Sequence, residues 1–178
     1  MTPIERGGIP APFTGHAATV RPEWIDENGH MNSAANPTGF GEAYYVVVFD
    51  GAIDHLWAAI GLGQPYRERT QHGTFAAESH ILYKAELLLG DQMQVSTQIM
   101  AADNKRIHLA HEMRRADGMV AAQQEVMLLH VSLQTRRVVP FLAEAVGLIA
   151  AAVQAHAAMP RPDWVGRRLT MPDAPPPA

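Results

Sequence analysis

Hydrophobic positions recur at three- and four-residue spacing between residues 37 and 60, which is the period of an amphipathic helix. Asn36-Pro37 is typical of a helix start, because Asn accepts hydrogen bonds from the free amides and Pro fits the first helical position. Gly61 and Gly63 are expected to end the helix. The run over residues 46–49 also suits a strand, but the length of the segment favours one long helix.

After residue 73 the pattern changes to strands separated by turn residues. Four antiparallel strands with a hairpin signal at each break are predicted over residues 74–88, 92–101, 105–115 and 119–133. Asp117-Gly118 is the strongest of these signals, because a type I′ turn needs positive φ at both central positions. A short strand over residues 135–141 and a helix over residues 142–157 are predicted to follow.

The order of elements predicts the α+β class. A short N-terminal strand, a long helix, a run of strands and a closing helix are most simply packed as one sheet wrapped around the long helix. The 178 residues are 47% hydrophobic and 18% charged, which is typical of one folded domain. Residues 1–15 and 159–178 are rich in Pro and Gly and predict terminal tails on either side of a domain over residues 16–158.

Charge and cysteine content exclude several classes of function. A net charge of -4 argues against a nucleic-acid binder, which would need a basic surface. No apolar stretch approaches the length of a membrane span. The absence of cysteine rules out disulfides and a cysteine nucleophile, and we expect a reducing cytoplasm as the setting. Of the 14 basic residues 12 are Arg, whose forked guanidinium groups suit phosphates as well as solvated strand ends.

Polar groups are densest over residues 24–33, just before the predicted long helix. Asp26 lies between a strand-like run and a glycine turn, where its carboxylate could act as a base or a nucleophile at the mouth of a pocket. Gly29 would let the backbone approach a ligand closely. Taken alone, Asp-x-Asn-Gly is also a common surface turn.

The stretch Asp26-Glu27-Asn28-Gly29-His30-Met31-Asn32 resembles the D-x-x-G-H-[VM]-N signature of the hotdog-fold acyl-CoA thioesterases of the 4-hydroxybenzoyl-CoA thioesterase superfamily. Later segments match in order over residues 78–91, 103–108 and 129–132. They are similar in particular to the branch that acts on betainyl-CoA in carnitine catabolism. The resemblance covers about residues 20–141, which is most of the predicted domain.

This resemblance implies a long central helix wrapped by a curved antiparallel sheet, a homodimer or tetramer, and acyl-CoA sites at the subunit interface. It implies hydrolysis to a free acid and CoA, with coenzyme A as part of the substrate and without a metal or another cofactor. Asp26 would attack the thioester itself or activate water. Gly29 and His30 would line the thioester, with amides near the helix start polarising its carbonyl. Asn28 and Asn32 would orient Asp26 or contact the acyl group.

Further candidates lie on the predicted strands. Glu78 and His80 are two residues apart and are expected to share one face with Thr74 and Leu82, either as an exposed strand face or as substrate-binding groups. Arg106 and Arg136 are the first candidates for holding the CoA phosphates. His108 and His111 are three apart on a strand and therefore point to opposite faces, which argues against a shared metal ion.

Two rival functions fit parts of the same pattern. A hotdog enoyl-CoA hydratase would carry a motif similar to D-x-N-x-x-H, which Asp26 and Asn28 fit, but His30 comes one residue too early. A non-catalytic acyl-CoA-binding protein would use Asp26 only structurally. Four aromatic residues suit a cage for a quaternary ammonium group, although core packing explains them equally well: Trp24, Trp57, Tyr44 and Tyr45.

Overall fold

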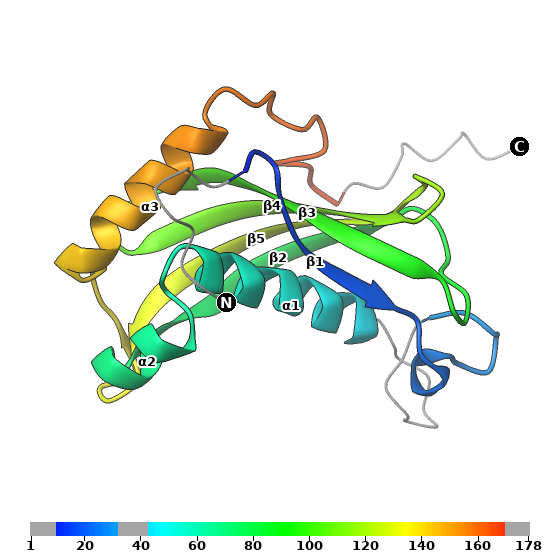
Figure 1. The fold of residues 1–178 in the computed structure, drawn as a ribbon, viewed down its shortest axis with the longest axis horizontal. Helices are drawn as coiled ribbons and strands as arrows, with labels where there is room; N and C mark the ends of the chain where they lie inside the picture. Colours follow the sequence, from blue (N-terminus) through cyan, green and yellow to red (C-terminus); the bar gives the residue numbers. More distant parts are fainter. Residues whose placement is uncertain (1–9, 32–42, 170–178) are drawn as a thin grey trace, which may run out of the picture.

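A computed structural model describes residues 10–31 and 43–169 of the chain. Helix α1 (Ala43–Ala59) lies along one face of a curved antiparallel sheet, with α2 (Gln64–Thr70) and α3 (Ala143–His156) at one end of it (Figure 1). The strands are β1 (Phe13–Thr19), β2 (His72–Tyr83), β3 (Gln92–Ala102), β4 (Arg106–Arg115), β5 (Val120–Ser132) and β6 (Arg137–Val138). The predicted α+β hotdog architecture, one long helix wrapped by a curved sheet, is confirmed.

The strand order is β1-β3-β4-β5-β2, with β6 paired to β5. The predicted hairpins β3–β4 and β4–β5 are present, but the predicted hairpin between the first two strands of the run is wrong. The type I′ turn predicted at Asp117-Gly118 is also wrong, because Gly118 has a positive φ of 90° and Asp117 does not. β2 ends at Tyr83 and pairs with β5, and the segment over residues 84–91 crosses to β3 instead. Turn residues at Gly90-Asp91 close a contact with the end of β1, since the Gly90 amide donates to the Val20 carbonyl at 3.0 Å. The turn residues therefore predict where the chain reverses, whereas the packing of the sheet around α1 determines which strand pairs with β2.

The helices largely follow the predicted pattern. α1 ends before Gly61, whose φ of 82° is the conformation that terminates a helix, and α3 occupies the predicted closing segment. The predicted start at Asn36-Pro37 lies outside the described residues. α2 was not predicted. Among the described residues no single helix is long and apolar enough to cross a membrane. Residues 44–59 of α1 and the helix α2 together have the length and composition of a membrane span, but the two helices are bent by 73° relative to each other.

The core divides along α1. Around its C-terminal half, Leu56 and Trp57 pack with α2, α3 and the middle strands. Around its N-terminal half, Val48 and Phe49 pack with the start of β3, the end of β4 and the segment that follows β1. β1 begins at Phe13, inside the segment that the sequence assigns to a tail. The two halves of α1 therefore face different surroundings, and the candidate site lies beside the N-terminal half.

Candidate active site

The motif segment folds as a tight hairpin between Ile25 and Met31, which form an isolated antiparallel bridge. It follows a short 3-10 helix, Pro22–Trp24. The Asp26 amide donates to the His30 carbonyl at 3.1 Å, and the Gly29 amide donates to the Asp26 carbonyl at 3.1 Å. Gly29 has a φ of 86°, a conformation that residues with a Cβ rarely adopt, so glycine is needed for the chain to reverse here.

The side chain of Asp26 turns back into this hairpin. Its Oδ1 accepts hydrogen bonds from the amides of Asn28 at 2.9 Å and His30 at 3.4 Å. Its Oδ2 accepts one from Nδ2 of Asn28 at 3.4 Å and lies 3.7 Å from Nδ1 of His30. The Asp26 side chain is 12% exposed and that of His30 is 32% exposed. The structure therefore brings together Asp26, Asn28, Gly29 and His30, with the carboxylate oriented by short-range donors.

The hairpin is anchored to the segment over residues 84–91, which crosses from β2 to β3 and is called the crossing segment below. The Met31 amide donates to the Leu87 carbonyl at 2.6 Å, and His30 forms an isolated bridge with Leu88. Both Met31 and Leu87 are buried, while Leu88 is exposed. Beneath the hairpin, the ring of Trp24 stacks on that of Tyr44 at the start of α1, with 5.1 Å between centroids. The position of Asp26 is thus set by contacts to the crossing segment and to α1.

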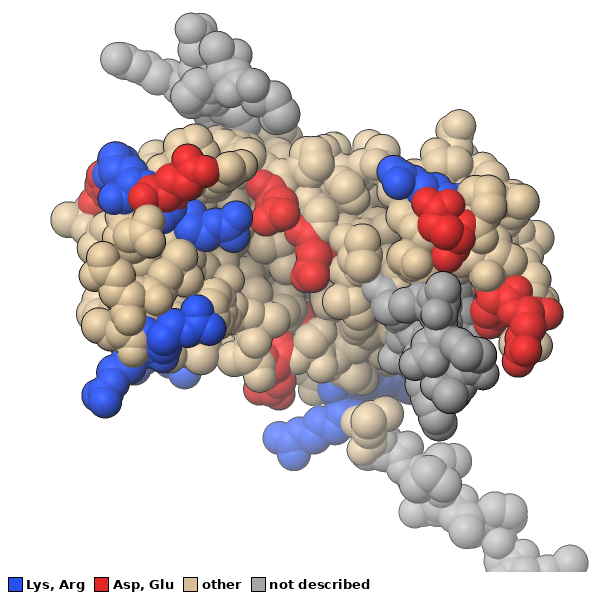
Figure 2. Space-filling model, turned by 90° about the horizontal axis from the view of Figure 1, so that it is seen from below, with Lys and Arg blue, Asp and Glu red and all other residues tan. Residues whose placement is uncertain are grey.

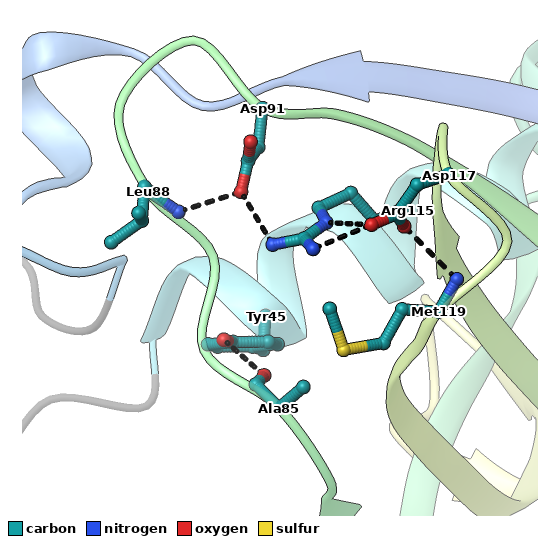
Figure 3. A network of polar contacts seen from close by, with 7 residues as sticks. All are labelled: Tyr45, Ala85, Leu88, Asp91, Arg115, Asp117 and Met119. Atoms are coloured by element: carbon teal, nitrogen blue, oxygen red, sulfur yellow. Dashed lines mark hydrogen bonds and ion pairs between the residues drawn. The ribbon is translucent and has the colours of Figure 1, made fainter.

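The crossing segment is held at both ends by polar contacts (Figure 3). Tyr45 of α1 donates its hydroxyl to the Ala85 carbonyl at 3.5 Å. At the other end, the Asp91 carboxylate accepts from the Leu88 amide at 2.9 Å and lies 3.5 Å from Arg115. Arg115 in turn pairs with Asp117 at 2.6 Å, and this pairing is the main reason that the pKa of Asp117 is lowered to about 2. The β4–β5 turn therefore supports the segment against which the hairpin rests.

This arrangement can serve acid and base chemistry. A mostly buried carboxylate held in one direction, with an imidazole four residues away, is suited to activating a water molecule or attacking a carbonyl carbon. Asn32 and the amides at the predicted helix start lie outside the described residues. The roles assigned to Asp26, Asn28, Gly29 and His30 stay predictions, which the geometry accommodates.

Glu78 and His80 lie elsewhere, on β2. They pair across the sheet with Met127 and Glu125, on the face opposite to α1. The expectation that Thr74 shares this face is wrong, because a register shift between Ala76 and Glu78 inserts an extra residue. Within one chain these two side chains are therefore on the outer face of the sheet, apart from the hairpin of Asp26.

The two candidate arginines lie at the end of the sheet remote from the Asp26 hairpin. Arg106 is the first residue of β4 and pairs with Asp103 of the preceding β3–β4 turn at 2.6 Å. Arg136 lies in the β5–β6 turn, with its guanidinium carbon 5.6 Å from the centroid of the Phe75 ring. A single chain therefore does not bring either guanidinium to Asp26.

The four aromatic residues do not form one cage. Trp24, Tyr44 and Tyr45 lie near the N-terminal half of α1, whereas Trp57 belongs to the core at its C-terminal half. Nor do the described residues include a group of three or more His, Asp or Glu side chains placed to hold a metal ion. His111, whose ring is fully buried with its Nδ1 2.9 Å from Thr97 Oγ1, has a pKa lowered to about 3 by burial.

Sequence reasoning missed two features of the surroundings. Most of the crossing segment was predicted to belong to a strand, whereas in the structure it leaves the sheet, and its buried residue Leu87 contacts the hairpin. Asp50 and Asp54, on α1, were passed over, although two carboxylates four residues apart within an apolar helix were visible in the sequence.

Comparison with known families places these features in context. A family model described as the thioesterase-like superfamily matches residues 20–169. The betainyl-CoA thioesterase of Pseudomonas aeruginosa is 37% identical over 161 residues, which are 90% of this chain and 96% of that protein. A Rhizobium meliloti protein named L-carnitine dehydrogenase/betainyl-CoA thioesterase is 31% identical over 173 residues. That match covers 93% of this chain but 33% of the relative, which is a longer protein.

Solved structures agree with this assignment. A putative thioesterase from Pseudomonas putida KT2440 superposes with a TM-score of 0.73 at 32% identity, covering 93% of this chain and 99% of that one. A hypothetical protein of Staphylococcus aureus, determined in complex with CoA, superposes with a TM-score of 0.79 at 28% identity and covers 93% of this chain and 100% of that one. The resemblance drawn from the motif is therefore confirmed at the level of family and fold.

Proposed function

Because the chain belongs to the thioesterase-like superfamily, we propose that it hydrolyses an acyl-CoA thioester to a free acid and CoA, with Asp26 as the catalytic carboxylate. The observation that carries this proposal is the orientation of Asp26 by the amides of Asn28 and His30 in a hairpin fixed against the crossing segment. Such preorganisation is what a base or nucleophile needs, since no reorientation is then required during the reaction.

Two routes use the same carboxylate. As a base, Asp26 takes a proton from water while the water oxygen bonds to the thioester carbon, after which the carbon–sulfur bond breaks and the thiolate of CoA leaves and is protonated. As a nucleophile, Asp26 itself bonds to that carbon, expels the thiolate and forms an anhydride that water then cleaves. His30, whose Nδ1 lies 3.7 Å from the Asp26 carboxylate, would bind the substrate beside it in either route.

A short acyl-CoA of the betainyl type is the proposed substrate. Support comes from the 37% identity to the betainyl-CoA thioesterase of Pseudomonas aeruginosa over almost the full length of both chains. We place the reaction in the cytoplasm, in keeping with a chain that has no cysteine.

A homodimer through β2 is the proposed assembly. Among the described strands β2 pairs only with β5, so its other edge is open along twelve residues. Phe75 and Tyr83 of β2 are exposed apolar side chains, and Val47 of α1 is exposed as well. Unpaired edges of this length favour pairing with another chain. In a dimer, Arg106 and Arg136 of one subunit would be available to the CoA phosphates at the site of the other.

The assembly can be tested with a matched pair of substitutions. Val47 on α1 is 52% exposed and Val146 on α3 is 51% exposed. We expect Val47→Asp to shift the molar mass measured by light scattering from dimer towards monomer, and Val146→Asp to leave it unchanged. Equal masses for wild type and Val47→Asp would argue against this interface.

The activity is tested by thiol release from a panel of acyl-CoAs, including betainyl, short-chain, long-chain and aryl members. Wild type is compared with Asp26→Asn and with Glu27→Gln, which removes a neighbouring exposed carboxylate as a control. We expect Asp26→Asn to lower kcat by about a thousandfold or more and Glu27→Gln to change it little. Tight binding of a panel member without any release would instead favour a non-catalytic binding protein, and water addition to an enoyl-CoA would favour a hydratase.

A further inference from the structure

An open cavity of about 710 Å³ lies between α1, α2 and the strands β2 and β5. One stripe of α1 lines it through positions spaced by three, one and three residues, which share a helix face. Aromatic rings from α2 and β2 also line it. The lining side chains of this stripe and these rings are Asp50, Ile53, Asp54, Trp57, Tyr66 and Phe75.

The cavity carries more negative than positive charge. Asp50 and Asp54 are exposed and lie one helical turn apart, and within residues 10–31 and 43–169 neither takes part in an ion pair. Partial burial of the Asp50 carboxyl, and then the neighbouring carboxylate of Asp54, raise the pKa of Asp50. Arg67 also lines the cavity, so one guanidinium stands against two carboxylates. Figure 2 shows acidic side chains across the middle of the face over α1.

The aromatic walls of the cavity are suited to an organic cation. Trp57 is fixed in place, since its Nε1 donates to Thr74 Oγ1 at 2.8 Å. Phe75 of β2 also lines the cavity and is 43% exposed, with the guanidinium carbon of Arg136 5.6 Å from the centroid of its ring. Ring faces attract cations, most strongly those that are weakly hydrated, such as methylated ammonium groups. A metal ion would need several oxygen ligands converging on one point, and the described residues contain no such group.

We infer that this cavity binds the methylated ammonium head of a short acyl group and thereby selects cationic acyl-CoA substrates over neutral ones of the same shape. The carboxylates of Asp50 and Asp54 supply the charge, and Trp57 and Phe75 supply the ring faces. This inference deepens the proposed function and rests on it.

The position of the cavity assigns it to the active site of a second copy. Tyr45 touches the crossing segment next to the Asp26 hairpin, whereas Asp54 lies nine residues, or about 14 Å, further along α1. A short acyl group cannot span that distance within one chain. Antiparallel pairing of two β2 edges brings the start of one strand beside the end of the other. The cavity borders the start of β2, so it would then face the crossing segment and Asp26 of the second copy.

The test uses two substrates that differ in one atom. Betainyl-CoA carries a trimethylammonium group, and 3,3-dimethylbutyryl-CoA carries a neutral tert-butyl group of the same shape. We expect wild type to favour betainyl-CoA in kcat/KM by at least about tenfold. Asp50→Asn/Asp54→Asn should abolish this preference while keeping turnover of the neutral substrate. Asp163→Asn, in the C-terminal segment, should leave the preference intact.

The outcomes separate this inference from the proposed function. An undiminished preference for betainyl-CoA in Asp50→Asn/Asp54→Asn overturns the cation site while leaving the thioesterase in place. If the wild-type protein releases no thiol from any acyl-CoA, the proposed function is overturned. The site is then still tested by calorimetric titration of both CoA esters into Asp26→Asn protein, where equal affinities would overturn it.

Mixed dimers test the assignment between subunits. Homodimers of Asp26→Asn and of Asp50→Asn/Asp54→Asn are mixed and allowed to exchange. If the site uses Asp26 of one chain and the cavity of the other, each mixed dimer has one intact site, and betainyl-CoA turnover should recover towards half of the wild-type value per mixed dimer. No recovery, with exchange verified by mass spectrometry, would place both parts in the same chain and overturn the assignment.

Discussion

The two ends of α1 present opposite kinds of polar environment. At the N-terminal end, the carboxylate of Asp26 is satisfied by donors within four residues and is held in place by the buried contact of Met31 with Leu87. From the middle of α1 towards its C-terminal end, Asp50 and Asp54 line an open cavity, and neither has an ion pair within the described residues. The comparison indicates that the chain itself fixes the direction of the Asp26 carboxylate, whereas the structure shows no such fixed partner for the two cavity carboxylates among the described residues.

The largest effect on stability should come from breaking the anchor of the Asp26 hairpin. Leu87 is fully buried and its neighbour Leu88 is 45% exposed. We expect Leu87→Ala to lower the free energy of unfolding by about 2–5 kcal/mol, because a cavity is left beneath the hairpin. Leu88→Ala should change it by less than about 0.5 kcal/mol. Urea unfolding measures both, and equal effects would contradict the anchoring role of Leu87.

The core beneath α1 should show a pH dependence that originates from His111. Burial lowers its pKa from 6.5 to about 3, so between these values the unfolded state binds one proton more than the folded state. Stability from this group is therefore complete above pH 6.5 and is lost progressively as the pH falls towards 3, by about 1.4 kcal/mol per pH unit.

This dependence can be isolated with His111→Gln. Burial also lowers the pKa of His130 and His156, but both remain in the variant, so the difference between the two proteins reports His111 alone. We expect the slope of unfolding free energy against pH between 5 and 6 to be shallower in His111→Gln by about 1 kcal/mol per unit. Parallel slopes would show that His111 titrates normally in the folded protein.

Several parts of this comparison could be predicted from local sequence. The end of α1 at Gly61, the turn at Asp117-Gly118 and the cluster around Asp26 each depend on residues that are neighbours in the chain. The family motif also pointed to the fold, which the family model and solved structures bear out.

Other parts depend on contacts that no local pattern encodes. β2 pairs with β5 rather than β3, because the crossing segment leaves the sheet to bury Leu87. An extra residue before Glu78 reverses which side chains share a face with Thr74, and a bulge of this kind has no glycine or proline to mark it. The cavity combines side chains from α1 and from β2, so its charge and its aromatic rings come together only in three dimensions.

A smaller effect is expected at Gly29, where the hairpin requires a positive φ, than at a buried core position, and a helical glycine serves as the control. Gly29 has a φ of 86°, whereas Gly147 lies within α3, and an added Cβ would meet nothing within 4 Å at either position. We expect Gly29→Ala to lower the free energy of unfolding by about 1–2 kcal/mol through backbone strain. Gly147→Ala should raise it by about 0.5–1 kcal/mol, because alanine favours the helix. Thermal unfolding of both variants gives the sign directly, and a stabilised Gly29→Ala would rule out the strain.

The smallest expected effect concerns the support behind the crossing segment. The Arg115 side chain is 23% exposed and joins Asp91 to Asp117, so its charge is partly screened by water. We expect Arg115→Gln to lower the free energy of unfolding only slightly, and less in high salt. Its effect on thiol release should also be smaller than that of Leu87→Ala, because the buried leucine, and not the ion pair, holds Met31 and hence Asp26. A loss of turnover in Arg115→Gln that matched Leu87→Ala would show that the polar network positions the hairpin as strongly as the apolar contact does.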